Sequence, residues 1–164
     1  MIAQMIGTVC GVGHLRPAPG TWGSLAALPL AWALHQLAGF PGLAVATLAI
    51  FAAGWWATAR MTAGSDDHDP SEIVVDEVAG QWIALAPLSY AAWDRGIEVL
   101  AMWPGWIAAF VLFRLFDIWK PWLVGMADRR GDALGVMLDD VIAGVFAAIG
   151  VLALAALAHG VIMT

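Results

Sequence analysis

Residues 141–158 read Val-Ile-Ala-Gly-Val-Phe-Ala-Ala-Ile-Gly-Val-Leu-Ala-Leu-Ala-Ala-Leu-Ala, without one charged side chain. A helix needs about 20 apolar residues to cross the hydrocarbon core of a bilayer, so this run predicts a membrane helix over Val141–Met163. The rest of the chain is similarly apolar: 62% of the 164 residues are hydrophobic and 12% are charged, about half the charged share of a soluble domain. We therefore expect a membrane protein with one domain over residues 1–164.

Four further apolar runs are candidates for membrane helices. They are Ser24–Ala38, Leu43–Ala59, Val78–Ala92 and Val99–Phe116. The first and third are short, at about 15 residues, and are candidates for re-entrant or partly submerged helices. No segment alternates in the manner of a β-strand. The fold class expected is an all-α polytopic bundle with four to five membrane-embedded helices.

The basic residues are distributed unevenly between the two sides of this bundle. If all five runs span, one side carries Arg16, Arg60, Arg114, Lys120, Arg129 and Arg130. The other side carries only Arg95. Because Lys and Arg stay on the cytoplasmic side, we expect the first side to face the cytoplasm of a bacterial inner membrane.

Several classes of protein are disfavoured by composition. The net charge of −6 with a single lysine argues against nucleic-acid binding, which needs a basic surface. Cys10 is the only cysteine, so no intramolecular disulfide forms. The first ten residues contain no basic segment, and we expect no cleavable signal peptide.

Two acidic pairs, Asp76-Glu77 and Asp139-Asp140, each open an apolar stretch. Four carboxylates at two helix starts suit Mg²⁺ or Mn²⁺, which prefer oxygen ligands. Gly80 and Gly144 follow the pairs, and small residues let membrane helices approach closely enough to bring the pairs together. The alternative is that each pair caps a helix N-terminus, where the helix dipole favours negative charge.

The segment before the first acidic pair has the residues of a helix start. Asp69 is a candidate N-cap, Pro70 fits the first helical position and Glu72 would close a capping box. This pattern predicts a helix from Pro70 with the acidic pair in its second turn.

Arg114, Asp117 and Lys120 are spaced three residues apart before Pro121, which ends the helix. This spacing places them along one side of a helix. Arg and Lys together are suited to hold a phosphate beside the metal. The alternative is an interfacial anchor in which Asp117 neutralises the basic residues and the neighbouring tryptophans form an aromatic belt.

The Gly- and Pro-rich residues 11–24 form a loop that enters a helix. Free backbone N–H groups there, with Arg16, Thr21 and Ser24, form a candidate phosphate site. The alternative is a turn with Ser24 as N-cap. Cys10 and Arg16 have the spacing of cysteine phosphatases, but Pro17 prevents the helix that such a loop must enter directly.

His68 is a candidate for proton transfer, because it lies among acidic residues on the charged side. An exposed loop histidine without a role is the alternative.

Together, four of these motifs resemble those of the phosphatidylglycerophosphatase A family over nearly the whole chain. They are Pro17–Ser24, His68-Asp69 with Ile73–Glu77, Phe113-Arg114 to Lys120-Pro121, and Gly135–Asp140 with Ala143-Gly144. The chain departs from the family pattern at Leu123-Val124 and Asp132-Ala133, which leaves the loop conformation open.

This resemblance implies a magnesium-dependent membrane enzyme that hydrolyses phosphatidylglycerophosphate to phosphatidylglycerol and phosphate. We expect the metal on the four carboxylates of the acidic pairs, Asp76, Glu77, Asp139 and Asp140, and the substrate phosphate on Arg114 and Lys120. Asp117 then orients these groups, completes the metal shell or acts as a nucleophile. The alternative function is a small cation or proton transporter, which would place its carboxylates halfway along the spans.

Overall fold

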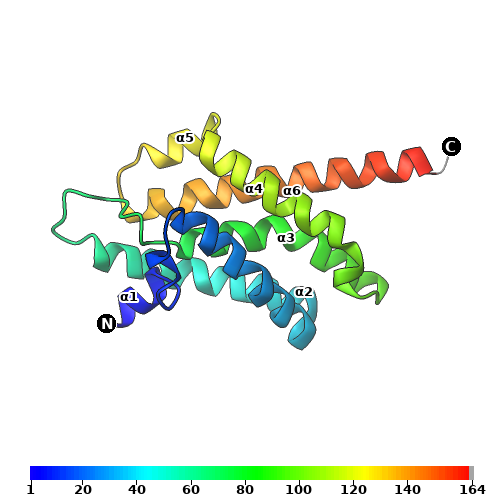
Figure 1. Cartoon of the computed structure of the whole chain (residues 1–164), viewed down its shortest axis with the longest axis horizontal. Helices are drawn as coiled ribbons and strands as arrows, with labels where there is room; N and C mark the ends of the chain where they lie inside the picture. Colours follow the sequence, from blue (N-terminus) through cyan, green and yellow to red (C-terminus); the bar gives the residue numbers. More distant parts are fainter. Residues whose placement is uncertain (163–164) are drawn as a thin grey trace.

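The computed structural model describes the backbone of residues 1–162 and the side chains of residues 1–158. The order is α1 (Ile2–Gly7), η1 (Val12–His14), α2 (Pro19–Met61), α3 (Val75–Arg95), η2 (Val99–Met102), α4 (Trp103–Trp119), α5 (Leu123–Asp128) and α6 (Ala133–Ile162). No strand occurs in this described part (Figure 1). The predicted all-α class is therefore confirmed.

Three stretches of the described chain are long and apolar enough to cross a membrane. They are Pro19–Met61, Val99–Trp119 and Ala133–Ala158. Large apolar side chains on their outer surfaces are exposed, among them Leu48 (72%), Ile118 (70%) and Leu157 (65%). A soluble monomer rarely exposes so much contiguous apolar surface, so these faces fit a lipid environment. The structure is that of an all-α membrane bundle.

Helix α2 consists of two helical arms that fold back on each other at Gly39. This residue has φ 62° and ψ −161°, outside the helical region, and Pro41 follows it. The two arms contain the two predicted runs Ser24–Ala38 and Leu43–Ala59, and they turn at the end of the bundle where Phe40 contacts Trp93 (Figure 1). The interruption therefore makes α2 a helical hairpin.

Helix α3 begins at Val75, so the predicted start at Pro70 is wrong. The backbone N–H of Val74 donates instead to the carbonyl of Gly7 in α1, at 2.9 Å. Ile73 and Val74 are buried. Burial of these apolar side chains and the bond to α1 outweigh the local capping pattern. As a result, Asp76 and Glu77 lie in the first turn of α3.

The α3–α6 contact is very close at Gly80 and Gly144, as predicted. A Cβ on Gly144 would overlap the carbonyl oxygen of Gly80, and a Cβ on Gly80 would lie 2.6 Å from the carbonyl oxygen of Asp140. The aromatic ring of Phe113 from α4 closes the same contact. Only glycine permits this approach, which sets the distance between the two acidic pairs.

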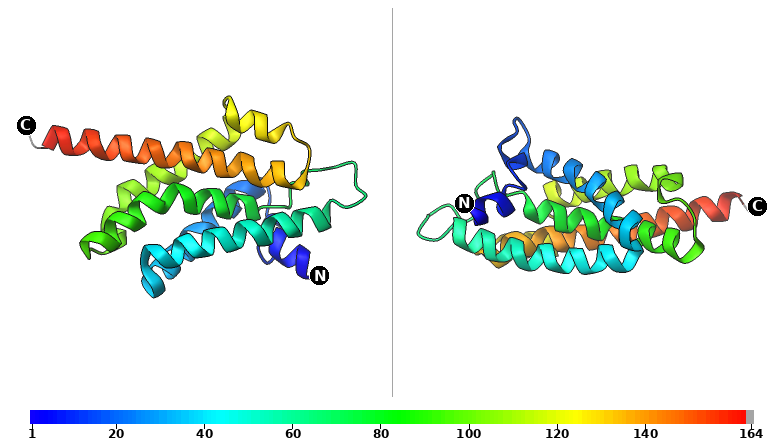
Figure 2. Two further views of the ribbon diagram at one scale, coloured as in Figure 1. Left: turned by 180° about the vertical axis from the view of Figure 1, so that it is seen from behind. Right: turned by 90° about the horizontal axis from the view of Figure 1, so that it is seen from below.

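The predicted site residues gather at one end of the bundle. α3 and α6 run in the same direction and α4 runs back toward their N-terminal ends (Figures 1 and 2). At the opposite end, Gln36 donates to Glu98 at 3.0 Å. The connections 11–23, 60–77 and 117–140 therefore meet at one end, as the five-run topology predicts.

Candidate active site

A cavity of about 260 Å³ lies at the end where these connections meet; we call it the acidic cavity. Its walls come from the start of α2, the loop before α3, the first turn of α3, the second turn of α6, and the end of α4. The lining contains six carboxylates and two basic side chains: Asp69, Asp76, Glu77, Asp117, Asp139, Asp140, Arg114 and Lys120. This excess of negative charge favours the binding of a cation.

Glu77 is held by residues from two other helices. Ser24 of α2 is fully buried, and its hydroxyl donates to Oε2 of Glu77 at 2.8 Å. Arg114 of α4 pairs through Nη1 with Glu77 and with Asp117, the latter at 2.7 Å. Ser24 therefore lies beneath the acidic cavity and orients Glu77, and it is not among the residues that line the cavity.

Three carboxylates converge in a way that suits a metal ion. Glu77, Asp117 and Asp140 each offer an oxygen atom, and these atoms lie within 4.8 Å of one another. Within the described side chains, Oδ2 of Asp140 is buried and has no hydrogen-bond partner. This buried carboxylate oxygen is free to accept a ligand, and a hard divalent cation fits this donor set. The three residues come from α3, α4 and α6.

The other member of each acidic pair is engaged differently. Oδ1 of Asp76 accepts the backbone N–H of Glu77 at 2.9 Å, and Oδ1 of Asp139 accepts that of Asp140 at 3.0 Å. Oδ2 of Asp139 also accepts from Lys120. Of the three converging carboxylates, Glu77 and Asp140 are among the four predicted metal ligands. The third, Asp117, lies on α4.

The capping alternative applies to only one of the two pairs. Asp76 and Glu77 occupy the first turn of α3. Asp139 and Asp140 lie well inside α6, which begins at Ala133, so the expectation that this pair starts a helix is wrong. The dipole effect fades within one turn and gives no reason for carboxylates at that depth.

Lys120 lies just beyond α4 in a left-handed conformation, with φ 48° and ψ 54°. Its ammonium group donates to Asp139 at 2.9 Å and to Asp128 at the end of α5. Burial alone would lower the pKa of Lys120, but these two bonds outweigh it and raise that pKa. The lysine therefore stays protonated and keeps a positive charge at the mouth of the cavity.

Asp69 belongs to the site, although its sequence context predicts a helix cap. It lines the acidic cavity from the loop before α3. Loss of hydration at the cavity mouth raises its pKa, against the attraction of Lys120 and with the help of Asp128, Asp67 and Asp117. Because α3 starts later than predicted, its carboxylate faces the cavity.

Besides Ser24, three predicted site residues lie outside the lining of the acidic cavity. Arg16 and His68 are exposed and Thr21 is half-buried. His68 lines a separate cavity of about 530 Å³, together with Arg130. The structure therefore does not bring these three side chains together with the carboxylates.

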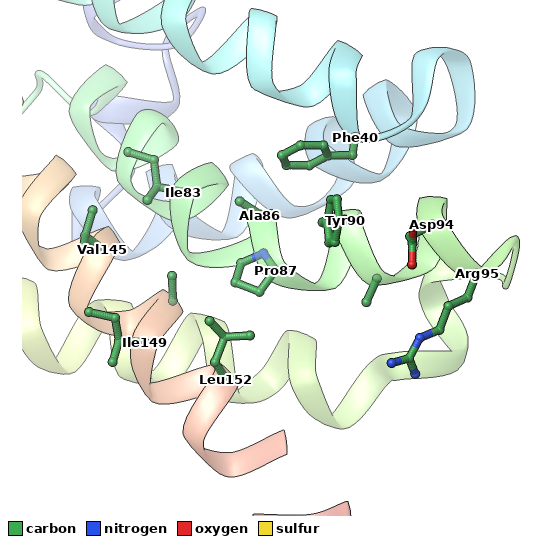
Figure 3. Close-up of a pocket in the computed structure, with 12 residues that line it drawn as sticks. Phe40, Ile83, Ala86, Pro87, Tyr90, Asp94, Arg95, Val145, Ile149 and Leu152 are labelled. Carbon is green, nitrogen blue, oxygen red and sulfur yellow. The ribbon is translucent and has the colours of Figure 1, made fainter. Parts of the chain in front are cut away.

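A second cavity lacks the cluster of carboxylates and basic side chains that lines the acidic cavity. This cavity of about 550 Å³ lies between α3 and α6 beside Phe40. Its walls are apolar except for Asp94 and Arg95 near the far end of α3 (Figure 3). The groove contains none of the predicted site residues.

The sequence is similar to known bacterial proteins over most of its length. It matches the family Phosphatidylglycerophosphatase A over residues 5–155. It is 38% identical to "Phosphatidylglycerophosphatase A" of Haemophilus influenzae over 88% of this chain and 83% of that one. It is 36% identical to the Escherichia coli protein of the same name, over 84% and 74%.

A Bacteroides thetaiotaomicron protein named "Putative phosphatidylinositol-3-phosphatase" is 40% identical, over 87% of this chain and 86% of that one. No solved structure matches the chain. The family match covers all the helices that form the acidic cavity, from α2 to the first turns of α6. On this similarity, the chain belongs to the Phosphatidylglycerophosphatase A family.

Proposed function

We propose that this protein hydrolyses phosphatidylglycerophosphate to phosphatidylglycerol and inorganic phosphate, with Mg²⁺ or Mn²⁺ as cofactor. The observation that carries the proposal is the convergence of Glu77, Asp117 and Asp140 beside Arg114 and Lys120. Carboxylates for a divalent cation and basic side chains for phosphate are the two halves of a metal-dependent phosphatase site. Family membership supports the lipid substrate.

The chain supplies three kinds of group to this reaction. Glu77, Asp117 and Asp140 would hold the metal, which when bound polarises the phosphate and lowers the pKa of a water molecule. Arg114 and Lys120 bind the phosphate oxygens and neutralise the charge that shifts onto them in the transition state. Ser24 keeps Glu77 in place.

Water can attack the phosphorus directly or hydrolyse a phosphorylated Asp117, and the protein has groups for both routes. Rapid quenching with labelled substrate distinguishes them. Acid-stable label on the wild-type protein that disappears in Asp117→Asn supports the covalent route. Turnover with no label trapped on the protein supports direct attack.

The first experiment measures phosphate release by purified protein in lipid–detergent micelles. We expect release from phosphatidylglycerophosphate that is abolished by a chelator and restored by Mg²⁺. No release, or release that a chelator does not affect, contradicts the proposal. A parallel assay with a phosphatidylinositol 3-phosphate substrate tests the activity that the name of the Bacteroides relative suggests.

A membrane transporter fits the structure less well. Its coupling carboxylates would lie midway along the spans, whereas the carboxylates of the acidic cavity gather at one end. Proton or cation flux in proteoliposomes, without phosphate release, would favour the transporter.

We propose that the acidic cavity faces the cytoplasm of a bacterial inner membrane, because most basic residues lie at its end of the bundle. Cys10 provides a natural reporter, since it is exposed and follows α1 at that end. An impermeant maleimide is expected to label Cys10 only after the cells are permeabilised. Labelling of intact spheroplasts contradicts this orientation.

A further inference from the structure

Gln81 in α3 is fully buried, and within the described side chains neither end of its amide has a hydrogen-bond partner. Leaving a buried polar group unpaired is costly, so a native protein rarely keeps one without a reason. The established family assignment and the acidic cavity give Gln81 no role.

The helical position of Gln81 places it beneath Arg114. Gln81 follows Glu77 by four residues and precedes Leu88 by seven, so all three share one face of α3. Both ends of this face contact α4: Glu77 pairs with Arg114, and the side chain of Leu88 packs against Gly105. Gln81 lies between them and therefore faces α4, one turn deeper than Glu77.

Arg114 has an unpaired donor in the same region. Within the described side chains, its guanidinium group makes contacts through Nη1, with Glu77, Asp117 and, at 3.4 Å, the hydroxyl of Ser24. Its Nε is buried and lacks a partner within the described chain. A buried donor on α4 and a buried acceptor on Gln81 thus share the α3–α4 interface.

We propose that Gln81 is a positioning residue for Arg114, acting through an internal water molecule. The water accepts the Nε–H of Arg114 and donates to Oε1 of Gln81. Internal waters commonly join buried polar groups in this way, at little cost compared with a direct bond. The proposal rests on the proposed phosphatase function, in which Arg114 binds the substrate phosphate.

This arrangement fixes the plane of the guanidinium group from two sides. Carboxylates hold Nη1, and Gln81 holds Nε from below. Nη2, which makes none of these contacts, is left to bind the phosphate. Because the N–H bonds of Nη2 lie in the guanidinium plane, rotation of that plane turns them away from the phosphate and weakens the bond.

The kinetic test compares Gln81→Leu with Thr58→Val. Thr58 of α2 is a matched control, because its hydroxyl is also fully buried and unpartnered in the described chain. We expect Gln81→Leu to lower kcat/KM about ten- to hundred-fold, mainly through KM, without a lower unfolding temperature. Thr58→Val keeps wild-type kinetics. Gln81→Met, which is unbranched like glutamine, serves as a second variant, and wild-type kinetics in both Gln81 variants overturn the proposal.

A spectroscopic test needs no substrate. In ¹⁵N-arginine-labelled protein, we expect one Nε–H signal that exchanges slowly with solvent and disappears in Arg114→Lys. In Gln81→Leu this signal should shift and lose its protection, and in Thr58→Val it should not change. An identical Arg114 signal in wild type and Gln81→Leu overturns the positioning role. An inactive wild type would instead refute the phosphatase proposal and leave this result standing.

Discussion

Replacing Gly80 with alanine tests whether the α3–α6 crossing sets the geometry of the acidic cavity. The new Cβ would lie 2.6 Å from the carbonyl oxygen of Asp140, and ordinary contact begins at 3.4 Å. The shortfall of about 0.8 Å must be met by a movement of α6. The ring of Phe113 lies as close, at 2.5 Å, but the carbonyl is backbone, so no side-chain rotation relieves that clash and the carboxylate of Asp140 moves away from Glu77.

A displacement of this size matters more to the site than to the fold. Metal–ligand distances tolerate about 0.2 Å, and a misplacement of about 1 Å can cost 100-fold in rate. We expect kcat/KM to fall about 100-fold and the Mg²⁺ concentration for half-maximal activity to rise. Overpacking costs about 1–3 kcal/mol, and replacing a helical glycine returns about 1 kcal/mol, so the variant should remain folded.

The assay is phosphate release across a Mg²⁺ titration, with circular dichroism to confirm folding. Gly150→Ala is the control on α6, because its Cβ would meet only the side chain of Leu112, at 2.8 Å, which can rotate. Wild-type activity and Mg²⁺ dependence in Gly80→Ala refute the reasoning. An equal loss in Gly150→Ala refutes it too, because it would show a general effect of packing.

Three further predictions concern single side chains. Asp140→Asn should lose both its activity and its thermal stabilisation by Mg²⁺. Asp132→Asn, which lies outside the acidic cavity, should keep both. Equal stabilisation of the two variants by Mg²⁺ counts against the metal site. The pKa of Lys120 is raised in the folded protein. Its stabilising effect is therefore complete below the ordinary lysine pKa of about 10.4 and fades above it. The unfolding temperatures of wild type and Lys120→Gln should differ by a constant amount from pH 7 to pH 9. The pKa of Asp69 is raised in the folded protein, so folding is less favourable once this carboxyl ionises. Asp69→Asn should therefore unfold at a higher temperature than wild type at pH 7 and at the same temperature below pH 3. A difference in unfolding temperature that stays the same across this pH range contradicts the prediction.

Much of the architecture follows from local sequence patterns. Apolar length identifies the membrane helices, and Pro121 marks the end of α4 near Trp119. The small residues Gly80 and Gly144 indicate the crossing that joins the acidic pairs. These features depend on residues close in sequence, so composition and spacing reveal them.

The structure departs from the local sequence patterns where distant segments decide the outcome. The start of α3 depends on a hydrogen bond from Val74 to Gly7, which no capping pattern contains. Ser24 looks like a phosphate ligand in its loop, but tertiary packing turns its hydroxyl toward Glu77. The sequence allows Asp117 to complete the metal shell, but its grouping with Glu77 and Asp140 depends on how three helices meet.

The same meeting of distant helices constrains how the protein is made. Glu77 is synthesised on α3, before its partner Arg114 on α4. An unpaired buried charge is expensive in a bilayer, so α3 and α4 should insert as a pair or with the carboxyl of Glu77 protonated. Asp140 arrives last, on α6. Under the proposed function, the three carboxylates can hold a metal only after α6 has been synthesised, so chains stalled before that point should lack phosphatase activity.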